Sequence, residues 1–218
     1  MTQDLNMGAF RLGEPALVCR WRLANRKLPL QSRHLKALSM RRVNGKRIDQ
    51  NLVVWARQHI EWTLESGSSA YPNGVLMLII DTDGQAAMTV GPFEPMRETS
   101  LSCLVDRSRQ AHEEAERTGI APETLWLVRD GVLLFDEESA TTISGSASLV
   151  ESLAHTLGMP VRRDPLLRVG VEQGSRDFEE AFLVSDEYGV VPSFDFGGPR
   201  GKRFADGYER LLANERKR

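Results

Sequence analysis

Hydrophobic and polar positions follow helical spacing in some stretches of the chain and strand spacing in others. The clearest helical pattern covers residues 49–65, where apolar side chains recur every three or four positions. The clearest strand pattern is the continuous apolar run at residues 75–80, which an Asp-Thr-Asp-Gly turn joins to a second strand at residues 85–90. Mixed helices and strands predict an α/β protein of the α+β type.

The second half of the chain shows the same mixture. An Asp-Gly pair, a strong turn signal, separates two apolar runs and predicts a hairpin at residues 125–135. Small residues from Ser144 open the next helix, and Gly158 closes it. The remaining predicted elements are a helix at residues 105–118, strands near residues 168–171 and 181–184, and a last amphipathic helix after residue 198.

A break in this patterning divides the chain. Residues 91–99 contain two prolines and show neither helical nor strand periodicity. We therefore expect an N-terminal subdomain at residues 1–92, a connector at residues 93–104 and a C-terminal subdomain at residues 105–218.

Charge and composition exclude several classes of partner. Lys and Arg number 28 against 30 Asp and Glu, for a net charge of −2, so there is no basic excess for binding nucleic acid. No apolar run approaches the ~20 residues that span a bilayer, and residues 1–10 do not resemble a signal peptide. Cys19 and Cys103 form no disulfide or zinc motif. We expect a cytoplasmic protein that binds neither nucleic acid nor membrane.

The histidines give no indication of a metal site. His34, His59, His112 and His155 do not have the spacing of known ligand sets. His59 lies on the apolar face of its helix and is expected in the core, and His112 is expected on the surface. We therefore expect no bound metal.

The small-residue turn at Ser144-Gly145-Ser146 is a candidate anion site. Backbone N–H groups at a helix N-terminus, together with hydroxyls, can hold a phosphate or a carboxylate. Helix capping alone explains these serines equally well.

Three segments, in the same order and at similar spacing, resemble one known family. Residues 28–38 (LPLQSRHLKAL) are similar to an early helix with an H-L-x-R-L pattern, and residues 125–160 to a strand hairpin and the helix that seats a cofactor phosphate. Residues 180–192 (EAFLVSDEYGVVP) are similar to a strand that ends in a G-[IV]-x-P turn. The family is that of the class IV aminotransferases, which includes branched-chain and D-amino-acid aminotransferases and aminodeoxychorismate lyase.

This resemblance implies two subdomains with the fold of a pyridoxal-phosphate enzyme. It also implies a pocket between the subdomains, lined by the connector and by the turns at Ser144 and Ser185, and a homodimer as the assembly.

The catalytic residues of that family are missing from this sequence. Its lysine forms a Schiff base with the cofactor, and no other side chain substitutes easily. There is no lysine between Lys46 and Lys202, and the matching position falls near Leu101. The E-x-x-S-N pattern, whose carboxylate pairs with the pyridine nitrogen, is also absent.

The residues that hold the cofactor phosphate in the family differ here as well. Ala37 stands at the arginine of the H-L-x-R-L pattern, and Ser146 stands at a threonine. Asp186, followed by Glu187, replaces a hydroxyl residue. Two like charges at ~4 Å repel by about 4 kcal/mol at a surface-like dielectric, so a carboxylate disfavours a phosphate in this place.

We interpret the chain as a protein of this fold with a degenerate cofactor site. The hypothesis is that it binds or converts a small amino-acid or chorismate-like acid without pyridoxal phosphate. Its catalytic residues are unknown, and the predicted ligand-binding residues are Ser144, Gly145, Ser146, Ser185, Asp186 and Glu187.

Three alternatives remain open. The chain could be a pyridoxal-phosphate enzyme of unusual architecture, in which Lys36 or Lys202 reaches the pocket. It could be a non-catalytic partner subunit of an active homologue. The acidic pair Asp186-Glu187 could also be no more than a solvated turn between strands.

Overall fold

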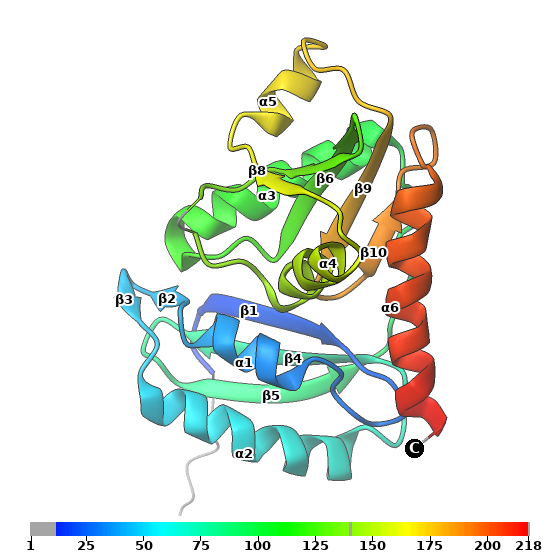
Figure 1. Cartoon of the computed structure of the whole chain (residues 1–218). Helices are drawn as coiled ribbons and strands as arrows, with labels where there is room; N and C mark the ends of the chain where they lie inside the picture. Colours follow the sequence, from blue (N-terminus) through cyan, green and yellow to red (C-terminus); the bar gives the residue numbers. More distant parts are fainter. Residues whose placement is uncertain (1–11, 140, 218) are drawn as a thin grey trace, which may run out of the picture.

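A three-stranded and a five-stranded β-sheet form the two halves of the molecule, and two short strands at residues 42–43 and 46–47 pair as a separate hairpin (Figure 1). The computed structural model describes residues 12–139 and 141–217, with the side chains of the last helix as far as Asn214. The segment considered above as a signal peptide lies outside these residues. Within the described part of the chain, no helix is both long and apolar enough to cross a membrane.

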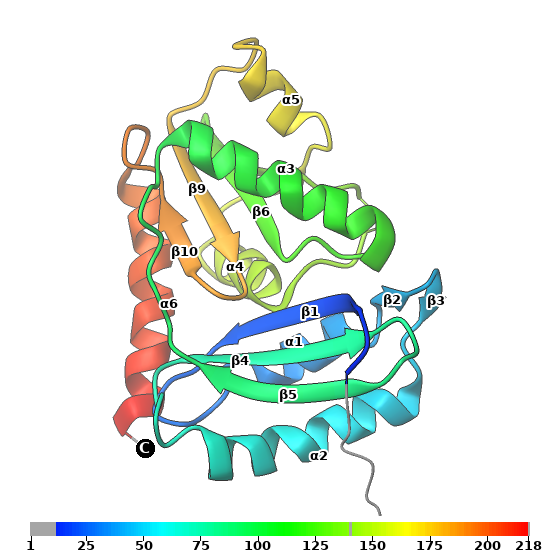
Figure 2. The ribbon, with the colours of Figure 1, turned by 180° about the vertical axis from the view of Figure 1, so that it is seen from behind.

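The N-terminal half is an antiparallel sheet covered by two helices. Its strand order is β1-β4-β5, and helices α1 and α2 pack with β1 and β4 around one apolar cluster. Figure 2 shows α2 running beneath β5. The elements are β1 (Pro15–Arg22), α1 (Gln31–Leu38), β2 (Arg42–Val43), β3 (Lys46–Arg47), α2 (Gln50–Gly67), β4 (Val75–Asp81) and β5 (Ala86–Gly91).

The C-terminal half is a mixed sheet with helices on both faces. Its strand order is β10-β9-β6-β7-β8, in which β7 and β8 pair in parallel and the other neighbours are antiparallel. The elements are α3 (Leu101–Thr118), β6 (Glu123–Arg129), β7 (Val132–Phe135), α4 (Gly145–Thr156), β8 (Val161–Arg163), α5 (Leu167–Glu172), β9 (Glu180–Ser185), β10 (Gly189–Pro192) and α6 (Pro199–Lys217).

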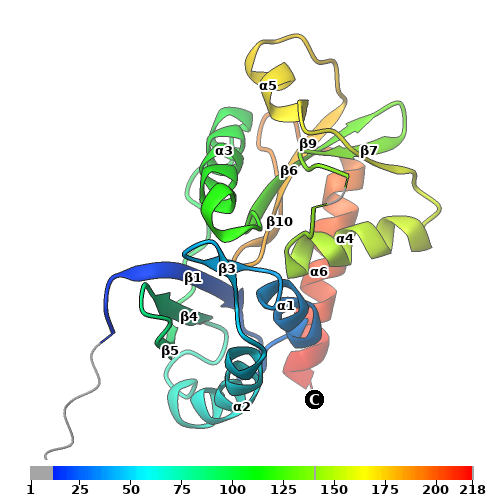
Figure 3. The same ribbon diagram turned by 90° about the vertical axis from the view of Figure 1, so that its left-hand side faces the viewer.

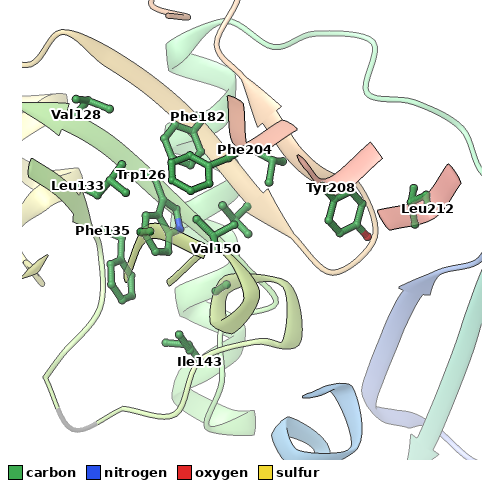
Figure 4. Packing of buried hydrophobic residues seen from close by; sticks show 14 of the residues in the cluster. Trp126, Val128, Leu133, Phe135, Ile143, Val150, Phe182, Phe204, Tyr208 and Leu212 are labelled. Atoms are coloured by element: carbon green, nitrogen blue, oxygen red, sulfur yellow. The ribbon is translucent and has the colours of Figure 1, made fainter. Parts of the chain in front are cut away.

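The central strands β6 and β9 are buried on both faces. Trp126 and Phe182 pack against α4 and α6, and Figure 4 shows Phe182 beside Phe204, with Tyr208 further along α6. The alternate positions, such as Leu127, pack with α3 in a second cluster. Because both faces are covered, these strands carry apolar residues almost without interruption.

Most predicted elements are present. Helix α2 matches the predicted helix at residues 49–65, and Asp49 caps it by accepting a hydrogen bond from Asn51 N at 2.7 Å. Both predicted hairpins are confirmed, as strands β4–β5 and β6–β7.

Two predictions about helices need correction. The predicted strand at residues 168–171 is wrong, because this segment is the short helix α5, which follows a turn in which Asp164 accepts a hydrogen bond from Leu166 N. Helix α3 begins at Leu101 and not at residue 105, because the Ser100 hydroxyl accepts from Cys103 N at 3.4 Å. The last residues of the predicted connector are therefore helical.

Helix α6 runs from β10 down to the level of the N-terminal sheet (Figures 1 and 2). Tyr208, on this helix, packs against Gly189 at the start of β10, where φ is +74°. A Cβ atom at Gly189 would clash with the Tyr208 ring, so glycine is required both by the backbone angle and by the contact.

A pair of glycine substitutions separates these two requirements. Gly84 has a φ of +80°, and a Cβ atom there would meet nothing within 4 Å, so Gly84→Ala should cost about 1 kcal/mol of unfolding free energy. Gly189→Ala should cost a further ~1–3 kcal/mol, because the methyl group overpacks against Tyr208. Urea unfolding of both variants measures the difference, and equal losses would contradict the contact.

Candidate functional site

The residue after β9, Asp186, lies at the junction of the two halves. Its side chain is buried, and its Oδ1 atom accepts a hydrogen bond from Ser146 N, in the first turn of α4, at 2.8 Å. The Nδ1 atom of His34, on α1, is 3.6 Å from the same oxygen. The backbone oxygen of Asp186 accepts from Arg22 N, on β1, at 3.2 Å. One residue therefore connects β9, α4, α1 and β1.

The surroundings of Asp186 favour its ionised form. Burial by itself would raise the pKa of this carboxyl. The His34 imidazole, the Ser146 N–H group and the Arg41 guanidinium together outweigh burial and hold the pKa below its ordinary value. Asp186 is thus a buried carboxylate at a helix N-terminus, where negative charge is favoured. The interpretation of a solvated turn is wrong for this residue.

The predicted anion site of α4 already holds an anion, and that anion belongs to the protein. Ser144 caps the helix by accepting from Ala147 N at 3.3 Å, and it is fully buried. A Cβ atom at Gly145 would clash with the His34 ring, so α1 packs closely on this turn. Because Asp186 takes the Ser146 N–H, that N–H group is not open to an external phosphate.

The other three predicted residues line a cavity. Ser185, Asp186 and Glu187 face a space of about 370 Å³ between β1, α3 and the β9–β10 turn. Neither Ser144–Ser146 nor the predicted connector is among its lining residues. Three arginines, four carboxylates and one phenol give the cavity its charge and polarity: Arg20, Arg41, Arg107, Glu114, Glu123, Asp186, Glu187 and Tyr188.

One wall of the cavity is a fixed ion pair. Arg107, on α3, donates from Nε and Nη2 to the two oxygens of Glu123 at 2.9 and 2.7 Å. The Ser185 hydroxyl donates to the same carboxylate at 2.9 Å, and the Arg107 guanidinium lies 4.8 Å from the centre of the Tyr188 ring. An ion pair with two hydrogen bonds is geometrically specific, so the side chains of Arg107 and Glu123 are held in fixed positions along this wall.

The cavity is also lined by Glu114, one of whose carboxylate oxygens accepts no hydrogen bond from the described residues. Arg41 is 3% exposed, and its Nη1 atom donates to the Ile120 carbonyl at 3.0 Å. The same nitrogen lies 3.5 Å from Glu114 Oε1, which is buried and accepts no hydrogen bond from the described residues. Burial raises the pKa of Glu114. The Glu114 side chain is nevertheless 32% exposed and lines the cavity, so its carboxylate can face a ligand.

The cavity contains no evident nucleophile among its described lining residues. Cys19 lines it, but burial raises the pKa of this thiol to about 11, so it stays protonated near neutral pH. No lysine is among the described lining residues. Lys36 and Lys202, the two lysines considered above, are both exposed and lie outside this cavity.

Several residues at or near this site were not singled out in the sequence. His34 belongs to the motif of α1, but nothing in its spacing predicts a contact with Asp186. Glu114 and Arg107 lie on a helix with many charged residues. The sequence of such a helix does not show which of its carboxylates is buried without a hydrogen-bond donor. In the described part of the chain, no group of three His, Cys, Asp or Glu side chains could hold a metal.

Two expectations about histidines need correction. His59 is only part-buried, between the rings of Trp55 and Trp62. His112 is not a free surface residue, because its two ring nitrogens lie 2.8 and 2.6 Å from the carbonyl oxygens of Ser108 and Asp136.

Substitution of Asp186 tests the junction. Asp186→Ala leaves the buried Ser146 N–H unsatisfied and should cost about 1–3 kcal/mol of unfolding free energy. Asp186→Asn keeps the size and removes the charge. Because the pKa is lowered, the carboxylate stabilises the fold above its ordinary value of 3.8, and this stabilisation is lost as the pH falls through the lower folded value.

The stability difference between wild type and Asp186→Asn should therefore shrink when urea unfolding is repeated at about pH 3 rather than pH 7. Asp206→Asn, at an exposed position of α6, is the matched control. A difference that stays constant with pH would contradict this electrostatic account.

Comparison with known proteins gives a result in structure only. No family model matches the sequence, and no curated protein matches it. A putative branched-chain amino acid aminotransferase from Thermotoga maritima aligns with a TM-score of 0.61 at 15% identity, over 92% of this chain and 86% of that one. A putative 4-amino-4-deoxychorismate lyase from Legionella pneumophila aligns with a TM-score of 0.57 at 11% identity, over 96% and 97%.

A third structure is a hypothetical aminotransferase from Mycobacterium tuberculosis in its PLP-bound form. It aligns with a TM-score of 0.61 at 13% identity, over 97% of this chain and 95% of that one. At such identities the likeness concerns the fold and not the chemistry. The chain has the fold of the class IV aminotransferases, as the sequence predicted.

Proposed function

We propose that the cavity beside Asp186 binds or converts a small amino acid or related acid without pyridoxal phosphate. The observation that carries this proposal is the hydrogen bond from Ser146 N to the buried Asp186 carboxylate. In this fold, the resemblance places the cofactor phosphate at the N-terminus of α4. Here that place is taken by a side chain of the protein itself.

The residues present do not fit pyridoxal phosphate. A phosphate dianion next to Asp186 would meet a carboxylate whose lowered pKa keeps it ionised. Ala37 supplies no cation, and Leu101 stands where the resemblance places the Schiff-base lysine. These three differences concern separate contacts of the cofactor, so one compensating change could not restore them all.

The charges of the cavity support an amino group in the ligand. Three arginines face four carboxylates, and each arginine lies close to one of them: Arg20 is 3.4 Å from Glu187, Arg41 3.5 Å from Glu114 and Arg107 2.7 Å from Glu123. The side chains that a ligand can reach include Glu114, which is 32% exposed, and Arg20, which is 53% exposed. An ammonium at Glu114 and a carboxylate near Arg20 would match this arrangement. A purely acidic, chorismate-like ligand matches it less well.

The alternatives are less well supported. A pyridoxal-phosphate enzyme of this kind needs an amine in the cavity beside Asp186, and neither Lys202 nor Lys36, which lines a different cavity, is among its described lining residues. A non-catalytic partner subunit is compatible with the geometry and would co-purify with a longer homologue. The homodimer and the cytoplasmic location expected above are part of this proposal.

A cofactor-binding experiment tests the central part of the proposal. Purified wild-type protein mixed with pyridoxal phosphate and dialysed should give no borohydride-stable adduct that maps to the cavity beside Asp186. Asp186→Thr, which restores the hydroxyl that the resemblance implies, should retain more cofactor than wild type. A wild-type protein that retains the cofactor as well as the variant does would overturn the proposal.

A ligand screen by thermal shift tests the chemical class. A bound amino acid at a hundredfold excess over Kd stabilises the protein by about 2.7 kcal/mol, which thermal unfolding detects easily. Glu114→Gln should weaken this binding about tenfold, because it removes the charge that faces the ammonium. Glu116→Gln, at an exposed position of the same helix, should not change it. Equal binding by both variants would argue against a role for Glu114.

A further inference from the structure

A second cavity lies between α1 and α4, which pack side by side (Figures 1 and 3). Its volume is about 560 Å³, a size typical of small-molecule sites. Its lining contains the cations Arg33, Lys36 and Arg163, four hydroxyl residues, and one carboxylate, Glu151. It shares no lining residue with the cavity beside Asp186.

Arg33 reaches from α1 to α4 without meeting a carboxylate. Its Nη1 atom donates to the backbone oxygen and the hydroxyl of Ser148 at 2.9 and 3.0 Å, and its Nη2 atom donates to the Ser152 hydroxyl at 3.3 Å. All of these acceptors are neutral. Hydrogen bonds to α4 therefore hold the guanidinium in place. None of the described carboxylates forms an ion pair with it.

The other two cations add to this charge. Lys36, one turn further along α1, is exposed and forms no ion pair with the described carboxylates. Arg163 donates to the Thr141 carbonyl at 2.5 Å and lies 3.3 Å from Glu151 Oε1. Because Glu151 balances only one of the three cations, the cavity stays electropositive in a protein whose net charge is −2.

We propose that this cavity binds the phosphate group of a small phosphate monoester. Two unbalanced cations suit a dianion, and a guanidinium held in place recognises phosphate oxygens with little loss of freedom. The hydroxyl groups of Thr142 and Ser32, also in the lining, are further donors. A water occupies about 30 Å³ of liquid, so the cavity has room for an organic group as well as the phosphate. This site does not depend on the function proposed above.

Isothermal titration with phenyl phosphate, at constant ionic strength, tests the proposal. Wild type should bind saturably, and Arg33→Gln combined with Lys36→Gln should weaken binding at least about tenfold. Lys202→Gln, at an exposed position of α6, is the control and should bind like wild type. Lys36→Gln alone, at an exposed position that supports no described ion pair, should still weaken binding about threefold.

Inorganic phosphate distinguishes the monoester from the free ion. It should bind more weakly than phenyl phosphate, and equal affinities would overturn the assignment of a monoester. Absence of saturable binding, or the same affinity in wild type and in the double variant, would overturn the site itself.

Discussion

A buried carboxylate at the first turn of α4 connects the two halves of this molecule. The N-terminus of a helix has N–H groups without partners inside the helix, and burying them without acceptors is costly. Asp186 supplies an acceptor from a turn 40 residues away and lies within 3.6 Å of His34 on α1. The carboxylate thus lies where α1 packs on α4, and the backbone oxygen of the same residue accepts from Arg22 N on β1.

Strand β9 carries such a carboxylate at each of its ends. Glu180, its first residue, accepts from Arg200 N and Gly201 N at 2.9 and 2.8 Å, in the first turn of α6. Asp186, just after its last residue, does the same for α4. Both side chains are buried. One strand therefore fixes two helix N-termini with its own acids, and the Ser146 N–H of α4 is no longer open to an external anion.

The sequence predicted the fold well where the signals are local. The amphipathic pattern of α2 and the Asp-Gly turn of the β6–β7 hairpin involve residues close together in the chain, so they are visible without the structure. Helix α5 was missed because a six-residue segment is too short to show a helical period. The site was predicted only in part. The replacement of a hydroxyl by Asp186 was visible, but its contact with His34 joins residues far apart in sequence.

The pairing of Ser146 N with Asp186 can be observed directly by amide NMR. With pyridoxal phosphate added to wild-type protein, the Ser146 amide resonance should stay in place, because its hydrogen bond is already made within the protein. The same resonance should move at acid pH, when Asp186 becomes protonated. Because the pKa of Asp186 is lowered in the folded protein, this requires a pH below the ordinary value of an aspartate. A saturable shift of the Ser146 amide on addition of pyridoxal phosphate near neutral pH would contradict the account.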